Sequence, residues 1–279
     1  MAKVKKIVVI GGTSGIAHAC MRVWNQNPVE ITLVVRDTAK GQLVVNDLQA
    51  RNPDSVIRLL KADFLDPKLI RSMVQSIEAE GAPDIVLIAH GSLPNQQSCE
   101  RALDEAQTAL IVNGVSPVLF AEAFVSGMLK RNHGQLAVIG SVAGDRGRKS
   151  NYVYGSAKGL VARYVQGLQH RVANTKVNVV LIKPGPTLSP MTYHLAGQGG
   201  SGLASPEEVA NVIIKGVEKR KTIIYAPKKW KLIMLIISHI PDFIFNKINQ
   251  ILGNFFIQKK LGCNHYYNTP KSTNWKSIH

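Results

Sequence analysis

The chain has 279 residues, of which 45% are hydrophobic, so it can bury the core of one large α/β domain with an appendage. Its three cysteines lie far apart without a C-x-x-C pair, which gives no evident disulfide framework or cysteine metal site and favours a reducing cytoplasm. The formal net charge of +16, concentrated in the last quarter, indicates an anionic partner, such as membrane lipid or a phosphorylated substrate, or simply a soluble basic surface.

Short apolar runs rich in Val and Ile alternate along the chain with longer amphipathic segments. Apolar runs without clean alternation are typical of parallel strands that are covered on both faces. The order of strands and helices therefore predicts an α/β fold, a doubly wound parallel sheet of seven strands (a Rossmann fold), over residues 1–226. The predicted strands are Lys6–Ile10, Ile31–Arg36, Val56–Lys61, Asp84–Ala89, Leu136–Ser141, Val177–Ile182 and Thr222–Tyr225.

A glycine-rich turn follows the first predicted strand, whose apolar run is too short for a signal peptide. After Ile10 the sequence reads Gly-Gly-Thr-Ser-Gly-Ile-Ala, in which Gly11 and Gly15 let the backbone turn tightly and approach a pyrophosphate. The helix start adds free N–H groups and the positive end of the helix dipole. A turn without a ligand is the alternative to the predicted dinucleotide site, which consists of Gly11, Thr13, Ser14, Gly15 and Ile16.

The end of the second predicted strand bears on which dinucleotide is bound. An acid at this place hydrogen-bonds the ribose hydroxyls of NAD, whereas an arginine can pair with the 2′-phosphate of NADP. Arg36 comes first, and Asp37 follows it. The sequence therefore favours NADP(H) and keeps NAD(H) open.

Tyr154 and Lys158 are four residues apart, which places them on one face of a helix. An ammonium beside a phenol favours the ionised form, so we expect Lys158 to lower the pKa of Tyr154, the general acid that protonates a carbonyl oxygen as hydride arrives. Ser141, at the end of the fifth predicted strand, can orient that carbonyl. Asn113 is an amide within an apolar helical pattern. Tyr152 has no lysine four residues beyond it and lacks such a partner.

Together these motifs resemble the short-chain dehydrogenase/reductase family from about Lys3 to Pro227. The resemblance implies an NAD(P)-dependent reductase with no metal, and a catalytic tetrad of Asn113, Ser141, Tyr154 and Lys158. Lys158 would also hold the cofactor ribose. Homo-oligomers are usual in the family, so the chain is expected to assemble with copies of itself.

The resemblance also implies further contacts to the dinucleotide. They come from Asp63 and Phe64 after the third strand, His90 and Gly91 after the fourth, and Pro184, Gly185, Thr187 and Ser189 after the sixth. For Asp63 an ordinary turn residue is the alternative. The chain departs from the family at Ile88-Ala-His-Gly91, where Asn-Asn-Ala-Gly is usual, so His90 either replaces a polar anchor or packs.

Residues 144–154, 190–195 and 225–245 are similar to a branch of the family that reduces a polyprenyl-phosphate-linked 2-keto-pentofuranose to the arabinofuranose. This resemblance implies a lipid-linked sugar as substrate and a flavin-dependent oxidase as partner. Arg146, Arg148 and Lys149, in the loop before Tyr154, are candidates for binding the lipid phosphate or else form a solvated basic loop. Pro190–Ser205, rich in glycine, is expected to form a flap over the substrate.

Residues 227–279 are expected to form a basic, amphipathic helical appendage rather than a second domain. Apolar residues of Phe243–Phe256 recur at helical spacing, Leu232–Ile237 is too short to span a bilayer, and Trp230 with its flanking lysines suits a membrane interface. We expect this segment to lie on an anionic membrane surface, the cytoplasmic side of the inner membrane, or to pack on a partner subunit.

Two other functions remain open at this point. The protein could reduce another lipid-bound or acyl-carrier-protein-bound ketone, because the basic surface also suits an acidic carrier. It could instead be a non-catalytic dinucleotide-binding scaffold. Nucleic acid is not an expected partner, since the basic region has no recognition motif.

Overall fold

The computed structural model describes residues 4–189 and 203–247. Within them, seven strands form one sheet in the order β3-β2-β1-β4-β5-β6-β7, and every neighbouring pair is parallel. The strands are β1 (Lys5–Ile10), β2 (Val29–Val35), β3 (Val56–Lys61), β4 (Ile85–Ile88), β5 (Gly134–Ile139), β6 (Val177–Pro184) and β7 (Ile223–Ala226). The predicted doubly wound sheet is confirmed, and the ends of its strands differ from the predicted ones by a residue or two.

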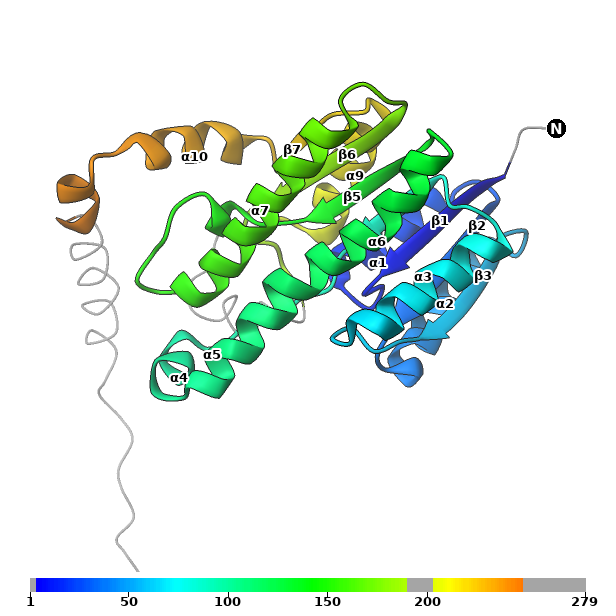
Figure 1. The fold of residues 1–279 in the computed structure, drawn as a ribbon, viewed down its shortest axis with the longest axis horizontal. Helices are drawn as coiled ribbons and strands as arrows, with labels where there is room; N and C mark the ends of the chain where they lie inside the picture. Colours follow the sequence, from blue (N-terminus) through cyan, green and yellow to red (C-terminus); the bar gives the residue numbers. More distant parts are fainter. Residues whose placement is uncertain (1–3, 190–202, 248–279) are drawn as a thin grey trace, which may run out of the picture. The chain divides into compact units, whose positions relative to one another are not determined.

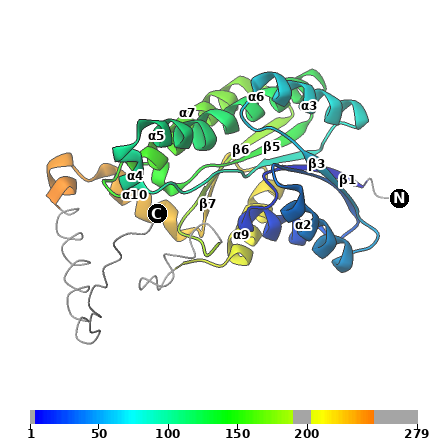
Figure 2. The same ribbon diagram turned by 90° about the horizontal axis from the view of Figure 1, so that it is seen from below.

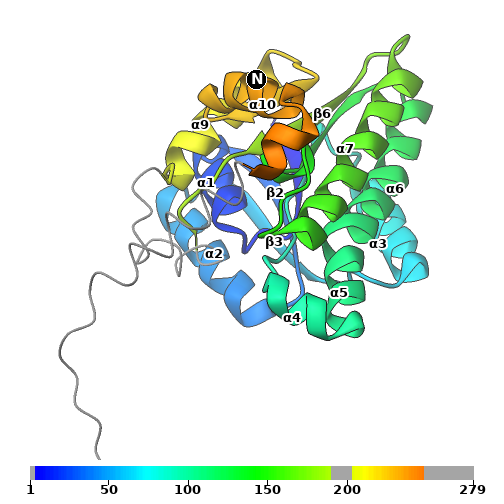
Figure 3. The same ribbon diagram turned by 90° about the vertical axis from the view of Figure 1, so that its left-hand side faces the viewer.

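Helices cover both faces of the sheet (Figure 1, Figure 2). Figure 3 views the layers from another side and shows α1 (Gly15–Trp24), α2 (Thr38–Arg51) and α9 (Pro206–Glu218) on one face, with α3 (Pro67–Glu80), α6 (Ser116–Lys130) and α7 (Tyr152–Val172) on the other. The other described elements are α4 (Gln96–Arg101), α5 (Leu103–Leu110), a π-helical turn (Ile111–Val115), a 3₁₀ turn (Val142–Gly144) and α10 (Lys229–His239).

The continuous apolar runs of the strands fill two cores. On β1, Ile7 and Val9 face the core under α1, α2 and α9, whereas Val8 and Ile10 face the core under α3, α6 and α7. All four side chains are buried. Because successive side chains of a strand point to opposite faces, a sheet that is covered on both sides needs apolar residues at every position.

The order of the strands reverses at β1, and this reversal positions the functional site. The chain leaves β1 for β2 and β3 on one side and returns to β4 on the other. The connections that leave the carboxyl ends of β1 and β4 therefore diverge, and a crevice opens between them, as is usual at such a switch point.

The helix that runs through Leu103–Lys130 is long and apolar enough to cross a membrane, and it is the one such helix in the part of the chain that the structure describes. Its residues Phe120, Phe124 and Met128 are fully buried in the core. We therefore assign it as a core helix.

The chain divides into two compact units, Met1–Ser238 and His239–His279. Almost all of α10 thus belongs to the unit that contains the sheet. Of the second unit the structure describes residues up to 247, of which 242–247 are helical. Most of the amphipathic helix predicted within Phe243–Phe256 lies outside the described residues, as does most of the predicted flap, residues 190–202.

Candidate active site

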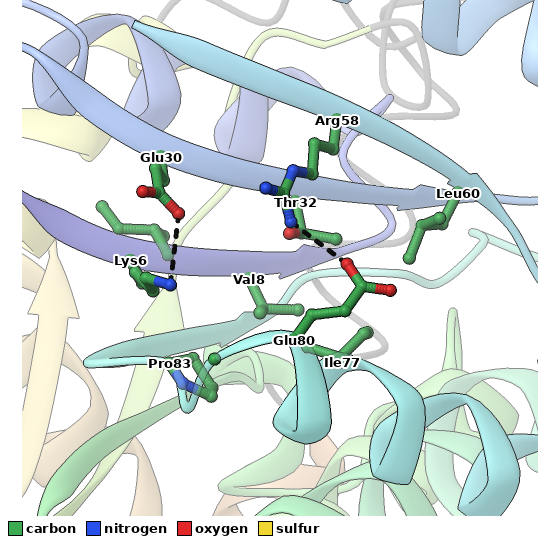
Figure 4. Close-up of a pocket in the computed structure, with 11 residues that line it drawn as sticks. Lys6, Val8, Glu30, Thr32, Arg58, Leu60, Ile77, Glu80 and Pro83 are labelled. Carbon is green, nitrogen blue, oxygen red and sulfur yellow. Dashed lines mark hydrogen bonds and ion pairs between the residues drawn. The ribbon is translucent and has the colours of Figure 1, made fainter.

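A cavity of about 440 Å³ lies at the carboxyl ends of the strands, between the turn after β1 and helix α10. A second hollow, of about 30 Å³, lies near the amino ends of β1, β2 and β3. Figure 4 shows that its charged side chains pair with one another: Lys6 with Glu30 at 3.5 Å, and Arg58 with Glu80 at 3.1 Å. Since these charges are satisfied and the hollow is small, the larger of these two cavities, both lined by described residues, is the candidate site.

The turn after β1 forms one end of this cavity. Gly11 has a φ of +80°, and a Cβ at this position would lie 2.6 Å from the Cβ of His90, so only glycine fits. Ser14 precedes α1, and its side chain makes no capping hydrogen bond. The first N–H groups of α1 therefore remain available for an anion, and the predicted Thr13, Ser14, Gly15 and Ile16 all line the cavity.

The end of β2 presents Arg36 and Asp37 to the same cavity. Asp37 caps α2: its Oδ1 accepts a hydrogen bond from the Lys40 N–H at 3.1 Å, and its Oδ2 lies 3.8 Å from the Lys40 Nζ. The guanidinium of Arg36 lies 6.0 Å from the centre of the Phe64 ring. The acid at this strand end is thus engaged in the helix cap, whereas Arg36 has no carboxylate partner in the described residues.

Phe64 is buried in the cavity wall, but its neighbour Asp63 does not line the cavity. The Asp63 carboxylate accepts hydrogen bonds from the Leu65 N–H at 2.7 Å and the Asp66 N–H at 3.4 Å. Asp63 therefore acts as a turn residue here, which is the alternative that the sequence left open.

His90 both packs in the core and lines the cavity. Its Nε2 hydrogen-bonds the Ser116 hydroxyl at 2.8 Å, and that hydroxyl donates its proton to the Phe64 carbonyl at 2.6 Å. The single hydroxyl proton is then used, so Nε2 must donate and Nδ1 must be an acceptor. Burial lowers the pKa of His90 to about 3, so the imidazole is neutral at physiological pH.

The predicted tetrad is assembled in the middle of the cavity. Tyr154 and Lys158 stand one turn apart on α7, with the Lys158 Nζ 5.8 Å from the centre of the tyrosine ring. Lys158 is buried and donates to the Ile139 carbonyl at 3.1 Å. Asn113 lies in the π-helical turn, where its amide donates to the Ala109 carbonyl at 2.9 Å and accepts from the Ser92 N–H at 2.8 Å. Irregular turns of this kind are frequent at functional sites.

The pKa of Tyr154 is shifted in the direction opposite to the predicted one. Burial raises the pKa of Tyr154 above its ordinary value, and the hydrogen bond with Ser141 lowers it in part. Burial also lowers the pKa of Lys158, to about 8. The predicted lowering of the Tyr154 pKa by Lys158 is therefore not seen: the desolvation of the phenol raises this pKa by more than the hydrogen bond with Ser141 lowers it. The neutral phenol is the form that a general acid needs.

The far end of the cavity is formed by the segment after β6, the loop before α7 and helix α10. Pro184, Gly185, Thr187 and Ser189 line the cavity, as do Arg148, Asn151 and Trp230. The Trp230 ring covers Gly185, since a Cβ there would lie 2.0 Å from the indole nitrogen. Trp230, which suits a membrane interface in the sequence, lies in the cavity wall in the structure.

The three basic residues of the loop before α7 have different surroundings. Arg148 lines the cavity, and its guanidinium contacts the Met234 sulfur at 3.6 Å. Arg146 donates to the Ile237 carbonyl at 2.6 Å, and Lys149 is exposed. Neither of the last two lines the cavity. Of the three predicted phosphate ligands, the structure thus brings Arg148 alone to the site.

A buried ion pair, which no motif of the sequence indicates, fixes this loop. Lys183, at the end of β6, pairs with Asp145 at 2.5 Å, and the Tyr225 hydroxyl donates to the other oxygen of Asp145 at 3.0 Å. Lys183 and Asp145 are almost fully buried, so breaking the pair would leave an uncompensated charge. The contact holds the loop between Ser141 and Arg148 against the sheet.

Comparisons with known proteins bear on this arrangement. A family model described as short chain dehydrogenase matches residues 5–198. An uncharacterised oxidoreductase of Streptomyces coelicolor is 27% identical over 88% of this chain and 96% of its own length. The NADP-dependent 3-hydroxy acid dehydrogenase of Schizosaccharomyces pombe is 24% identical over 80% of this chain and 90% of its own length.

Solved structures show the same fold. A short-chain dehydrogenase from Sphingobium yanoikuyae in complex with NADPH has a TM-score of 0.74, with 17% identity, over 86% of this chain and 97% of its own. A short chain dehydrogenase/reductase from Burkholderia phymatum in complex with NAD has a TM-score of 0.73, with 18% identity, over 83% of this chain and 92% of its own. With the match to the family model and the assembled tetrad, the chain belongs to the short-chain dehydrogenase/reductase family and is an NAD(P)-dependent oxidoreductase that acts on a carbonyl substrate.

Proposed function

We propose that this protein uses NADPH to reduce the keto group of a polyprenyl-phosphate-linked 2-keto-pentofuranose. Arg148 carries the proposal. It is a half-buried cation in the cavity wall, and among the described residues its guanidinium contacts no carboxylate, only the Met234 sulfur. Burial lowers the pKa of Arg148 because the charge is poorly solvated, and a bound phosphate would compensate that cost.

The residues present fit a dinucleotide. Gly11 leaves room for close approach of the backbone, α1 offers its free N–H groups to the pyrophosphate, and Lys158 is placed to hold a ribose. When bound, the cofactor supplies the hydride. Arg36 and the adjacent Lys40 favour the additional phosphate of NADPH, since Asp37 is engaged with Lys40 and the cap of α2.

The reduction itself needs a proton at the carbonyl oxygen. The Ser141 hydroxyl, which hydrogen-bonds Tyr154, orients that oxygen, and the Tyr154 phenol donates the proton. The buried ammonium of Lys158, held by the Ile139 carbonyl, then stabilises the tyrosinate that remains. The same Arg148 that binds the phosphate fixes the position of the sugar relative to Tyr154.

The proposal includes a flavin-dependent oxidase that supplies the ketone, and a homo-oligomer acting at the cytoplasmic face of the inner membrane. The test combines the two enzymes with radiolabelled polyprenylphospho-ribose and NADPH. Formation of the arabinose product supports the proposal, and its absence with an active oxidase contradicts it.

Arg148→Met and Arg148→Lys refine this test. Losing a charge-assisted hydrogen bond costs about 1.5–3 kcal/mol, so we expect kcat/KM for the lipid-linked sugar to fall by about ten- to a hundredfold in Arg148→Met. The loss should be smaller in Arg148→Lys, which keeps the positive charge. Reduction of a small uncharged ketone should change little. A matched control is Lys149→Met, which removes an exposed charge of the same loop.

A second candidate substrate is a keto acid. The similarity to the 3-hydroxy acid dehydrogenase of S. pombe favours it, and a carboxylate would also pair with Arg148. Turnover of 3-keto acids with NADPH at a higher kcat/KM than that of the lipid-linked sugar would favour this reading.

A further inference from the structure

Helix α10 has two different faces. Trp230, Ile233, Met234 and Ile237 recur at the spacing of one helical face and are buried or half-buried. Leu232, Leu235 and Ile236 lie on the opposite face and are 63%, 57% and 58% exposed. A helix of a soluble protein usually exposes polar residues on its outer face, so α10 is apolar on both sides.

The inner face belongs to the active site. The Trp230 ring lies on Gly185, the Met234 sulfur contacts Arg148, and the Ile237 carbonyl accepts from Arg146. The inner face of helix α10 therefore packs against the end of the cavity that Arg148, Gly185 and Trp230 form, which is the substrate end.

The outer face combines exposed apolar side chains with cations. Lys228, Lys229 and Lys231 are exposed at the start of the helix, and residues 228–239 contain no acid. Large apolar side chains bordered by lysines are complementary to a surface that is apolar inside and anionic at its rim. With eleven residues, α10 is too short to span a bilayer and would lie in its plane.

We propose that the outer face of α10 docks on the surface of an anionic lipid bilayer, so that the wall of the substrate end rests on the membrane. A lipid-linked substrate would then reach Tyr154 without its chain leaving the lipid phase. The identity of that substrate rests on the proposed function, whereas the docking does not.

The experiment uses the full chain and vesicles of phosphatidylglycerol and phosphatidylcholine in equal amounts, with vesicles of phosphatidylcholine alone as comparison. In co-sedimentation we expect the protein to bind the anionic vesicles, to bind neutral ones more weakly, and to be released by high salt. Leu232→Ser with Ile236→Ser should weaken binding by about tenfold or more. Lys229→Gln with Lys231→Gln should weaken it by about fivefold for each lysine.

Matched controls separate α10 from exposed apolar residues in general. Leu43→Ser with Leu103→Ser removes two leucines that are 69% and 83% exposed on other helices and should leave vesicle binding unchanged. Circular dichroism of every variant confirms that it is folded. Trp230→Ala, on the inner face, should keep vesicle binding but impair reduction of the ketone.

Several outcomes would overturn the proposal: no binding of the wild type to anionic vesicles, equal binding of the Leu232/Ile236 variant, or conversion of a dimer to a monomer in that variant. The last result would assign the face to a second copy of the chain. Because vesicle binding needs no substrate, a wild-type protein that reduces a short-chain phosphosugar but does not bind anionic vesicles rejects docking alone. A wild-type protein that binds anionic vesicles but does not reduce the short-chain phosphosugar rejects the proposed substrate alone.

Discussion

Two walls of the same cavity are built in different ways. The cofactor wall (Gly11, Ser14, Arg36, Phe64 and His90) consists of residues at or just after the carboxyl ends of strands. The substrate wall (Arg148, Asn151 and Trp230) joins a loop to a helix, and the contact of Arg148 with Met234 spans 86 positions in sequence. The first wall depends on the sheet, whose hydrogen-bonded register fixes it. The second depends on packing between the loop before α7 and helix α10, which can change without disturbing the sheet.

The largest expected effect tests the chemistry that the two walls share. Tyr154→Phe removes the proton donor and should lower kcat by about 10³-fold or more, with little change in the affinity for NADPH. Tyr152→Phe is the matched control, since this half-exposed tyrosine lies two residues away and does not line the cavity. Steady-state kinetics and cofactor fluorescence titration measure both quantities. Residual turnover of Tyr154→Phe near that of the wild type would reject the assignment of the general acid.

The second prediction concerns the cofactor wall alone. Arg36→Ala removes the cation at the end of β2, and we expect the affinity for NADPH to fall by about ten- to a hundredfold, because a charge-assisted contact to the 2′-phosphate is lost. The affinity for NADH should change little. Titration with both nucleotides decides the matter, and an equal loss for NADH would show that Arg36 does not select the phosphate.

The third prediction compares the two walls through two glycines: Gly11 of the cofactor wall, and Gly185, which follows β6 and lies against Trp230 of the substrate wall. Gly11→Ala places a methyl group against His90 at a φ of +80°, and should raise the KM for NADPH by about tenfold. Gly185→Ala displaces Trp230 and should raise the KM for the ketone by about as much. Gly147→Ala, with nothing within 4 Å of the added Cβ, is the control. If each glycine variant changed both KM values equally, the two walls would not be separable.

The difference between the walls also explains what the sequence could predict. Apolar runs rich in Val and Ile predict the sheet, and the sheet determines where Gly11, Ser141 and Pro184 lie. The glycine-rich turn identifies Gly11, the strand end identifies Ser141, and the resemblance to the family identifies Pro184. Tyr154 and Lys158 were found because helical spacing puts them on one face. The role of Asp63 is harder to predict, because an acid just after a strand can line the cavity or hydrogen-bond the backbone of the following turn. Which of the two occurs depends on local hydrogen bonds, here the one from the Leu65 N–H.

The substrate wall could not be predicted in the same way. Trp230, its lysines and the apolar stretch behind it form a pattern that fits a membrane interface, and nothing in the spacing shows that Trp230 packs on Gly185. The inward residues Trp230, Met234 and Ile237 do share helical spacing, but so do the exposed Leu232, Leu235 and Ile236. When both faces of a helix are apolar, only tertiary contacts decide which one is buried.

The smallest expected effect is a pH dependence at the tetrad. Burial places the pKa of Lys158 at about 8, below its ordinary value, so its charged form prevails below that pH and is lost as the pH rises. His90, with a pKa of about 3, does not titrate near neutrality, and the raised pKa of Tyr154 keeps the phenol protonated. We therefore expect kcat/KM for NADPH to be flat between about pH 6 and 7 and to fall about twofold at pH 8.

Lys158→Arg tests the origin of this alkaline limb, because a guanidinium keeps its charge throughout the range. The variant should be less active, since the guanidinium does not fit the position that donates to the Ile139 carbonyl, but its profile should lose the limb near pH 8. A limb that persists in the variant would place the titrating group elsewhere. An acidic limb near pH 6.5 in the wild type would instead show that His90 becomes protonated there, and that its burial does not keep it neutral.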